Sequence, residues 1–152
     1  MLALVSIALL SACGGSPDRE SQSSEANGSI AGGIWLEQEI LRGATLYLCP
    51  AKEQSQFKRL SQTRPGSDVA ASFFEIDLDR MNRTAEQVCP EQAAADIKGE
   101  YRFEAVEQGD YLLYAAHKGD RALAFWSLPV TVGEEAIALD LNESNASDRL
   151  AR

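Results

Sequence analysis

The stretch GEYRFEAVEQGDYLLYAA, residues 99–116, decides the fold. Apolar side chains alternate with polar ones in two runs, and a period of two is typical of half-buried β-strands. The inward positions are Tyr101 and Phe103 in the first run and Tyr111, Leu113 and Ala115 in the second. Gly109 and Asp110 lie between the runs and favour a turn. The stretch therefore predicts a central β-hairpin whose aromatic face points into a core.

Similar alternation occurs on both sides of this stretch. Residues 30–36 and 44–49 predict a hairpin that ends at Pro50, because proline has no backbone N–H for the ladder. Further strands are predicted at residues 123–126, 130–132 and 137–141. Short strands separated by turn signals indicate an all-β fold, a small antiparallel β-sandwich of about seven strands over residues 29–142.

The segment 50–98 interrupts this pattern as a partly helical insertion. Phe74, Ile76 and Leu78 alternate and predict a short strand. A helix is predicted after it from the spacing of Met81, Ala85 and Val88, with Thr84 and Gln87 as its capping box. At the other end of the chain, residues 143–152 form a polar tail with no pattern.

Length and charge bound the class of protein. The 152 residues suffice for one domain with a core, and a hydrophobic content of 45% is that of a globular protein. The formal net charge is −9. Nucleic-acid binding is disfavoured, because phosphate recognition needs a basic surface.

The N-terminal residues predict a secretory signal peptide. Residues 1–10 are an apolar run too short to span a bilayer, and Leu10-Ser11-Ala12-Cys13 resembles the lipobox of bacterial lipoproteins. The resemblance implies a signal peptide over residues 1–12 and acyl chains on Cys13, which would anchor the protein in a membrane. The alternative from the residues alone is an ordinary buried helix that ends at a free cysteine.

The residues after Cys13 predict how the domain is held. Residues 13–28 are rich in Ser, Gly, Asp, Glu and Asn and predict a flexible tether. In lipoproteins of this kind an Asp after the lipidated cysteine implies retention in the inner membrane. Gly14 stands there instead, so the resemblance implies the outer membrane, on its periplasmic face.

Two further cysteines, Cys49 and Cys89, are left once Cys13 carries lipid. An even pair in an oxidising compartment is expected to form a disulfide. Such a bridge would tie the far end of the 50–98 insertion to the second strand. Two separate buried thiols are the alternative.

The strand sequences also resemble a known family, the carboxypeptidase regulatory-like (transthyretin-like, prealbumin-fold) domains. The similar segments are Ile30 to Ile34, Gly43 to Leu48, Gly99 to Phe103, Gly109 to Leu113, Val130 to Val132 and Ile137 to Leu141. In that family the second strand leads to the Gly-x-Tyr/Phe-x-Phe strand through a much shorter link. The resemblance implies a scaffolding, adhesion or binding module without catalytic activity.

The residues that carry chemistry are few. His117 is the sole histidine, without an evident nucleophile or orienting acid, and a role at the end of a hairpin is the simpler interpretation. Glu75, Asp77 and Asp79 offer oxygen ligands, but their spacing matches no calcium loop and favours a solvated strand edge. The sequence therefore predicts no catalytic site, no metal site and no cofactor.

Three aromatic residues are candidates for binding: Trp35, Tyr47 and Trp126. On an outward sheet face they could stack on sugars or on a partner protein, and the alternative is that they are ordinary core or rim aromatics. We therefore expect a lipid-anchored binding or structural module of the cell envelope, with no enzymatic activity. Its partners would be the membrane, through the anchor, and an envelope protein or a glycan. The alternative function is a carbohydrate-binding module similar to starch-binding sandwiches.

Overall fold

The computed structural model describes residues 27–61 and 68–152. The predicted signal peptide, Cys13 and all but the end of the tether lie outside the described residues. Within the described part of the chain, no helix is both long enough and apolar enough to cross a membrane.

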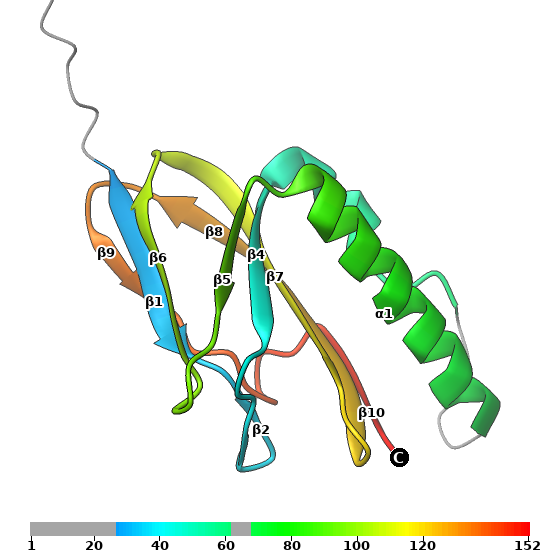
Figure 1. The fold of residues 1–152 in the computed structure, drawn as a ribbon. Helices are drawn as coiled ribbons and strands as arrows, with labels where there is room; N and C mark the ends of the chain where they lie inside the picture. Colours follow the sequence, from blue (N-terminus) through cyan, green and yellow to red (C-terminus); the bar gives the residue numbers. More distant parts are fainter. Residues whose placement is uncertain (1–26, 62–67) are drawn as a thin grey trace, which may run out of the picture.

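Two β-sheets pack face to face, and one helix covers the outer face of the larger sheet (Figure 1). The smaller sheet has the order β6-β1-β9, with β1 at Gly28–Gly33, β6 at Glu100–Val106 and β9 at Ala136–Ala138. The larger sheet has the order β10-β8-β7-β4-β5. Its strands are β4 (Thr45–Pro50), β5 (Glu91–Ala94), β7 (Gly109–Lys118), β8 (Ala122–Val132) and β10 (Asp148–Ala151). This arrangement confirms the predicted β-sandwich, but the pairing of β1 with β9 is parallel rather than antiparallel.

The remaining elements are a short hairpin and the helical layer. The hairpin pairs β2 (Trp35–Leu36) with β3 (Glu39–Ile40). The helical layer consists of the 3-10 helix η1 (Ala51–Gln56) and the helix α1 (Asp68–Val88). Both lie within the predicted insertion, which is therefore partly helical, as expected.

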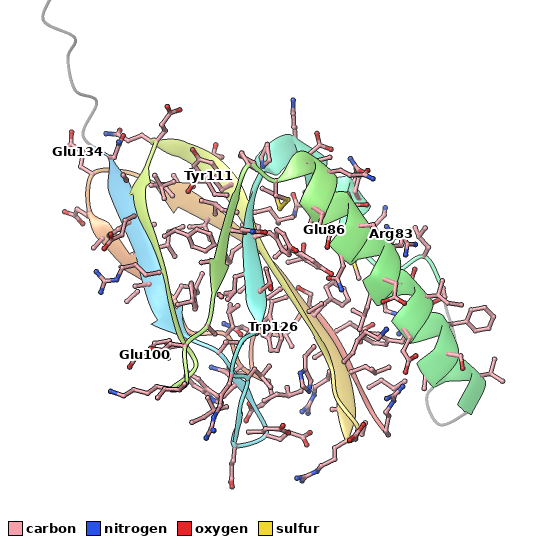
Figure 2. The ribbon with its side chains drawn as sticks, in the orientation of Figure 1. Arg83, Glu86, Glu100, Tyr111, Trp126 and Glu134 are labelled. Carbon is pink, nitrogen blue, oxygen red and sulfur yellow. A yellow bond between two sulfur atoms is a disulfide. The ribbon has the colours of Figure 1, made fainter. Side chains whose placement is uncertain are left out.

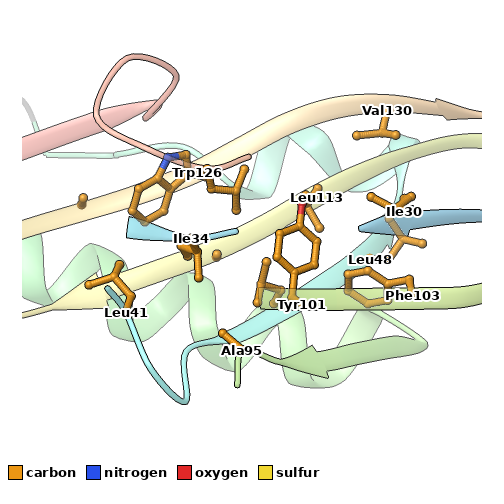
Figure 3. Close-up of a cluster of buried hydrophobic side chains, with 14 of the residues drawn as sticks. Ile30, Ile34, Leu41, Leu48, Ala95, Tyr101, Phe103, Leu113, Trp126 and Val130 are labelled. Atoms are coloured by element: carbon orange, nitrogen blue, oxygen red, sulfur yellow. The ribbon is translucent and has the colours of Figure 1, made fainter. Parts of the chain in front are cut away.

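The main core lies between the two sheets (Figure 3). Its members include Tyr101 and Phe103 from β6 and Leu113 from β7, each at most 3% exposed. This confirms the inward face predicted for these residues. Tyr111 is half-buried at the margin of the same core.

A second core lies between the larger sheet and α1. It is formed by Phe74, Leu78, Met81 and Ala85 of the helix and Leu112, Tyr114 and Phe125 of the sheet, among others. The helical residues recur at intervals of three and four, which places them on one helical face. Cys49 of β4 and Cys89, directly after α1, form the predicted disulfide across a separation of 40 residues.

The strand pairings differ from those predicted. The segments 99–106 and 109–116 are both strands, but β6 pairs with β1 and β7 pairs with β4 and β8. They therefore belong to opposite sheets and do not form a hairpin. The predicted hairpin of residues 30–36 with 44–49 is wrong for the same reason, because β1 and β4 also lie in different sheets.

The structure of the insertion and of the C-terminal segment also differs from the prediction. Phe74, Ile76 and Leu78 lie in α1 rather than in a strand. Thr84 lies inside this helix near its C-terminal end, where its hydroxyl donates to the carbonyl of Arg80 at 3.0 Å, so it is not an N-cap. The predicted polar tail contains β10, which pairs with residues 122–125 of β8. The described residues form ten strands. The strands β3, β5 and β10 were not expected, the predicted strand 30–36 is divided into β1 and β2, and the two strands predicted at 123–126 and 130–132 form the single strand β8.

Candidate functional site

A groove of about 790 Å³ lies on the smaller sheet and continues to the edge of β5. Its floor is formed by β1, the central strand of this sheet, where Ala31, Gly32 and Gly33 have small side chains or none. Glu100 and Arg102 of β6, both exposed, border the floor on one side. The groove exists because a strand of small residues lies beside a strand of long ones. We call it the Trp35 groove.

Trp35 lies directly over the floor. A Cβ atom added to Gly33 would lie 2.9 Å from Cζ3 of the Trp35 ring, so only glycine lets the indole approach the strand this closely. The ring is half-buried and lines the groove. It therefore has one side against the backbone of β1 and retains a solvent-accessible surface.

Two contacts fix the position of Trp35. Its backbone N–H donates to the carbonyl of Leu141 at 3.0 Å, and Trp35 is paired with Ile40 in the β2–β3 hairpin. The turn residues Glu37 and Gln38 have φ of 49° and 71°. A two-residue hairpin turn with two positive φ values is of the type that normally takes Asn-Gly, so this hairpin holds its shape without the preferred residues.

Asp140 closes the groove on the side opposite β6. Its carboxylate accepts a hydrogen bond from the backbone N–H of Gly33 at 2.8 Å. The neighbouring carbonyl of Leu139 points inward and accepts a hydrogen bond from the Tyr101 hydroxyl at 2.5 Å. This arrangement requires Gly32, because a Cβ atom there would lie 1.9 Å from the Leu139 oxygen. Residues 139 and 140 are therefore held by hydrogen bonds from both β1 and β6.

The loop between β5 and β6 supplies the other charged groups. The carboxylate of Asp96 accepts hydrogen bonds from the backbone N–H groups of Glu100 at 2.9 Å and Lys98 at 2.8 Å. These bonds hold the pKa of Asp96 below its usual value. The loop is thus a defined turn that places Lys98 at the groove beside Glu100 and Arg102.

The groove combines a half-exposed indole with cationic and anionic side chains. An indole face can stack on the apolar face of a sugar ring or on another flat group, and the charged groups can bind its polar substituents. In residues 27–61 and 68–152, no cluster of three or more His, Cys, Asp or Glu side chains is suited to hold a metal ion. The arrangement is that of a binding surface.

The other two candidate aromatics are buried. Trp126 is fully buried between the sheets, and its indole N–H donates to the carbonyl of Asn142 at 2.9 Å (Figure 2). Tyr47 is 8% exposed and packs in the second core, where burial and the nearby Glu86 raise the pKa of its hydroxyl. Only Trp35 of the three is placed to contact a ligand.

The remaining candidate residues are dispersed. His117 lies near the end of β7, half-buried, and burial lowers its pKa while Glu39 opposes the shift. Glu75, Asp77 and Asp79 lie on α1 rather than on a strand edge. Their carboxylates contact different cations: Arg152, then Arg59 and Arg80, then Lys118.

The sequence interpretation missed Lys98, Arg102 and Asp140 as groove residues. Charged residues on strand edges and loops are common, so their type and spacing gave no signal. The signal that was present is Gly32-Gly33 shortly before Trp35, since two glycines in a strand indicate a close approach of other groups.

The similarity of this chain to known proteins is low. No protein-family profile matches the chain, and no curated protein matches its sequence. Among solved structures, a candidate carbohydrate binding protein from Pseudomonas aeruginosa has a TM-score of 0.47 and 15% identity, over 81% of this chain and 92% of the other. The minor pilin of Streptococcus agalactiae has a TM-score of 0.45 and 13% identity, over 77% and 44%.

A candidate carbohydrate binding protein from Bacteroides uniformis has a TM-score of 0.39 and 14% identity, over 76% of this chain and 40% of the other. The chain thus spans less than half the length of the second and third of these proteins. At such low similarity in both sequence and backbone, nothing about the function of this chain follows from them.

Proposed function

We propose that the protein is a lipid-anchored, non-catalytic binding module of the cell envelope that recognises its ligand in the Trp35 groove. One observation carries the proposal: Trp35 alone of the three candidate aromatics keeps an accessible surface, and it lies in a groove lined by charged side chains. The lipobox-like sequence at Cys13 supports an anchor in the outer membrane, facing the periplasm.

A glycan is the ligand class that the groove favours. Carbohydrate recognition combines stacking on an aromatic face with hydrogen bonds to hydroxyl groups, and the groove offers both. The groups available for such hydrogen bonds are Lys98, Glu100, Arg102 and Asp140. An extended segment of an envelope protein is the second candidate, supported by the position of the groove between β6 and β5, which are both terminal strands of their sheets.

Tryptophan fluorescence tests the proposed site, because Trp126 is buried and Trp35 is the solvent-accessible indole. Titration with periplasmic glycan fragments, among them oligosaccharides of the cell wall, is expected to shift the emission of the wild type. Because Trp35→Ala removes the reporting indole, binding by the variants is measured by isothermal titration calorimetry. Trp35→Ala should lose binding, whereas Ile97→Ala, which alters an exposed side chain of the adjacent loop, should retain it. Glycan binding that survives in Trp35→Ala would contradict the proposed site.

The anchor is tested separately. The wild-type chain expressed in a Gram-negative host should incorporate a labelled fatty acid and fractionate with the outer membrane. Cys13→Ser should do neither. A Cys13→Ser protein that is still labelled would contradict the lipid anchor without bearing on the groove.

A further inference from the structure

The helix α1 carries a second apolar stripe in addition to the one that packs on the sheet. Val69, Phe73 and Ile76 are 58%, 44% and 61% exposed. Their spacing of four and then three residues places them on one helical face. The inward face contains Ala70, Phe74 and Leu78. Each follows an exposed residue of the stripe by one or two positions, which is a rotation of about 100–200° around the helix axis. The exposed side chains therefore form a distinct outward surface.

Leu60 is a further exposed apolar residue beside α1. Its side chain is 65% exposed, and its backbone N–H donates to the carboxylate of Asp77, the residue after Ile76, at 3.2 and 3.3 Å. We call Leu60, Val69, Phe73 and Ile76 the helix stripe. It contains four of the six large apolar side chains that are exposed in the described part of the chain. Exposed apolar residues normally occur singly over a protein surface, so several of them near one helix indicate a contact surface.

The chain has a net charge of −9, which disfavours contact with anionic headgroups. The charged side chains around the helix stripe are more balanced and are compatible with a lipid headgroup region. The carboxylates of Glu75 and Asp79 are each paired with a cation, Arg152 and Lys118. Arg83 is exposed and lies seven residues after Ile76, on the same helical face (Figure 2). Two acidic groups near the stripe, Glu75 and Asp79, are thus compensated, and an arginine borders its C-terminal end.

The size of the stripe restricts its occupant. Four partly exposed side chains offer a few hundred Å² at most, whereas a stable protein complex buries about 800 Å² on each partner. A patch of this size binds only when another link already holds it near its target, because the effective concentration is then high. The proposed lipid anchor provides such a link to one surface, the bilayer.

We propose that the helix stripe docks on the lipid leaflet in which Cys13 is anchored. This inference rests on the proposed anchor. Figure 1 shows the chain entering β1 at the end of the sandwich where α1 finishes, and α1 beginning at the opposite end. The segment from Gly14 to Asn27 can extend to about 50 Å, which exceeds the length of α1, about 32 Å. The anchor therefore lets the first half of α1 reach the membrane surface.

Quenching by brominated lipids tests this docking. Full-length lipidated protein is placed in phosphatidylcholine vesicles with or without bromine on the acyl chains. Phe73→Trp puts a reporter in the helix stripe, and Ile97→Trp puts a matched one at an exposed apolar site, 78% accessible, in the loop between β5 and β6. Emission beyond that of wild-type Trp35 and Trp126 should fall at least twofold for Phe73→Trp and remain unchanged for Ile97→Trp.

Adding Ile76→Glu to Phe73→Trp should abolish the quenching, while circular dichroism and the Cys49–Cys89 disulfide report intact folding. Equal quenching of both reporters, or of neither, would overturn the docking proposal. Sedimentation of Cys13→Ser protein as a dimer, reversed by Phe73→Glu, would assign the stripe to a second copy and also overturn it. If the wild type does not float with the vesicles, the anchor fails and the docking falls with it. Flotation without quenching refutes the docking alone.

Discussion

The hydroxyl of Tyr101 donates a hydrogen bond to the main-chain carbonyl of Leu139 from inside the core, at 2.5 Å. Tyr101 is 3% exposed, and burial raises the pKa of its hydroxyl, so it stays protonated as a donor. The bond links β6 to the segment after β9 across β1, the strand that forms the floor of the Trp35 groove. The core and the groove therefore share one structural element.

Removing this hydroxyl should destabilise the fold. Tyr101→Phe leaves the Leu139 carbonyl without its partner, at a cost of about 1–3 kcal/mol in the free energy of unfolding. Urea denaturation measures this cost. The control is Tyr111→Phe, whose lost bond to the Glu107 carbonyl is 2.9 Å long and exposed to solvent, and it should cost less than 1 kcal/mol. Equal effects of the two variants would contradict a special role for the buried bond.

Gly32 should tolerate no side chain. Gly32→Ala would place a Cβ atom 1.9 Å from the Leu139 oxygen, so β1 and the segment after β9 would have to separate. We expect the free energy of unfolding to fall by about 2 kcal/mol or more, with thermal unfolding as the readout. Ligand binding in the Trp35 groove should also weaken. The matched control is Gly133→Ala, because no atom lies within 4 Å of its added Cβ. A stable Gly32→Ala protein would show that the carbonyl can move.

Backbone conformation gives a pair of opposite predictions. Gln38 has φ of 71°, and Gly43 has φ of 70° with open space around it. Gln38→Gly should raise the free energy of unfolding by about 0.5 kcal/mol, because glycine adopts this region without steric cost. Gly43→Ala should lower it by about 1 kcal/mol for the same reason. Denaturant midpoints that shift in the same direction would contradict this account.

The disulfide should contribute strongly to stability. It closes a segment of 40 residues between Cys49 and Cys89 that contains the whole helical layer. Loop-closure entropy gives about 4 kcal/mol for a segment of this length. Cys49→Ala combined with Cys89→Ala should lose this amount in urea denaturation, and reduction of the wild type should have a similar effect. A double variant as stable as the wild type would show that helix packing alone holds the layer.

Asp77 should make stability depend on pH. Burial alone would raise its pKa, but hydrogen bonds from Ser61 and Leu60 and the charge of Arg80 lower it below the usual value. A lowered folded-state pKa means that the stabilisation is complete above the unfolded value, about 3.9, and is lost as the pH falls through the folded value. The wild type should exceed Asp77→Asn in stability at pH 7, and the difference should shrink below pH 4. A difference independent of pH would exclude the carboxylate charge as its origin.

The sequence by itself determined where the main strands of the two large sheets lie and which side chains of β6 face the core. Tyr101 and Phe103 face the core because β6 has one buried face, and such a strand needs alternating polarity. The Cys49–Cys89 disulfide was also predictable from the even number of cysteines left after Cys13 and from the oxidising compartment that the lipobox-like sequence implies. These properties depend on residue type and local spacing, so they can be read from the chain.

Only the tertiary structure decided which strands pair, because alternation fixes the face of a strand and not its neighbour. Residues 99–116 therefore gave two correct strands and a wrong hairpin. Phe74 and Leu78 fit a period of two and a period of four equally, and packing on the larger sheet selected the helix and left Ile76 outside. The Trp35 groove depends on contacts between distant residues, such as Asp140 with Gly33, 107 positions apart. Such contacts arise only when the sheets assemble, so no local pattern in the sequence specifies them.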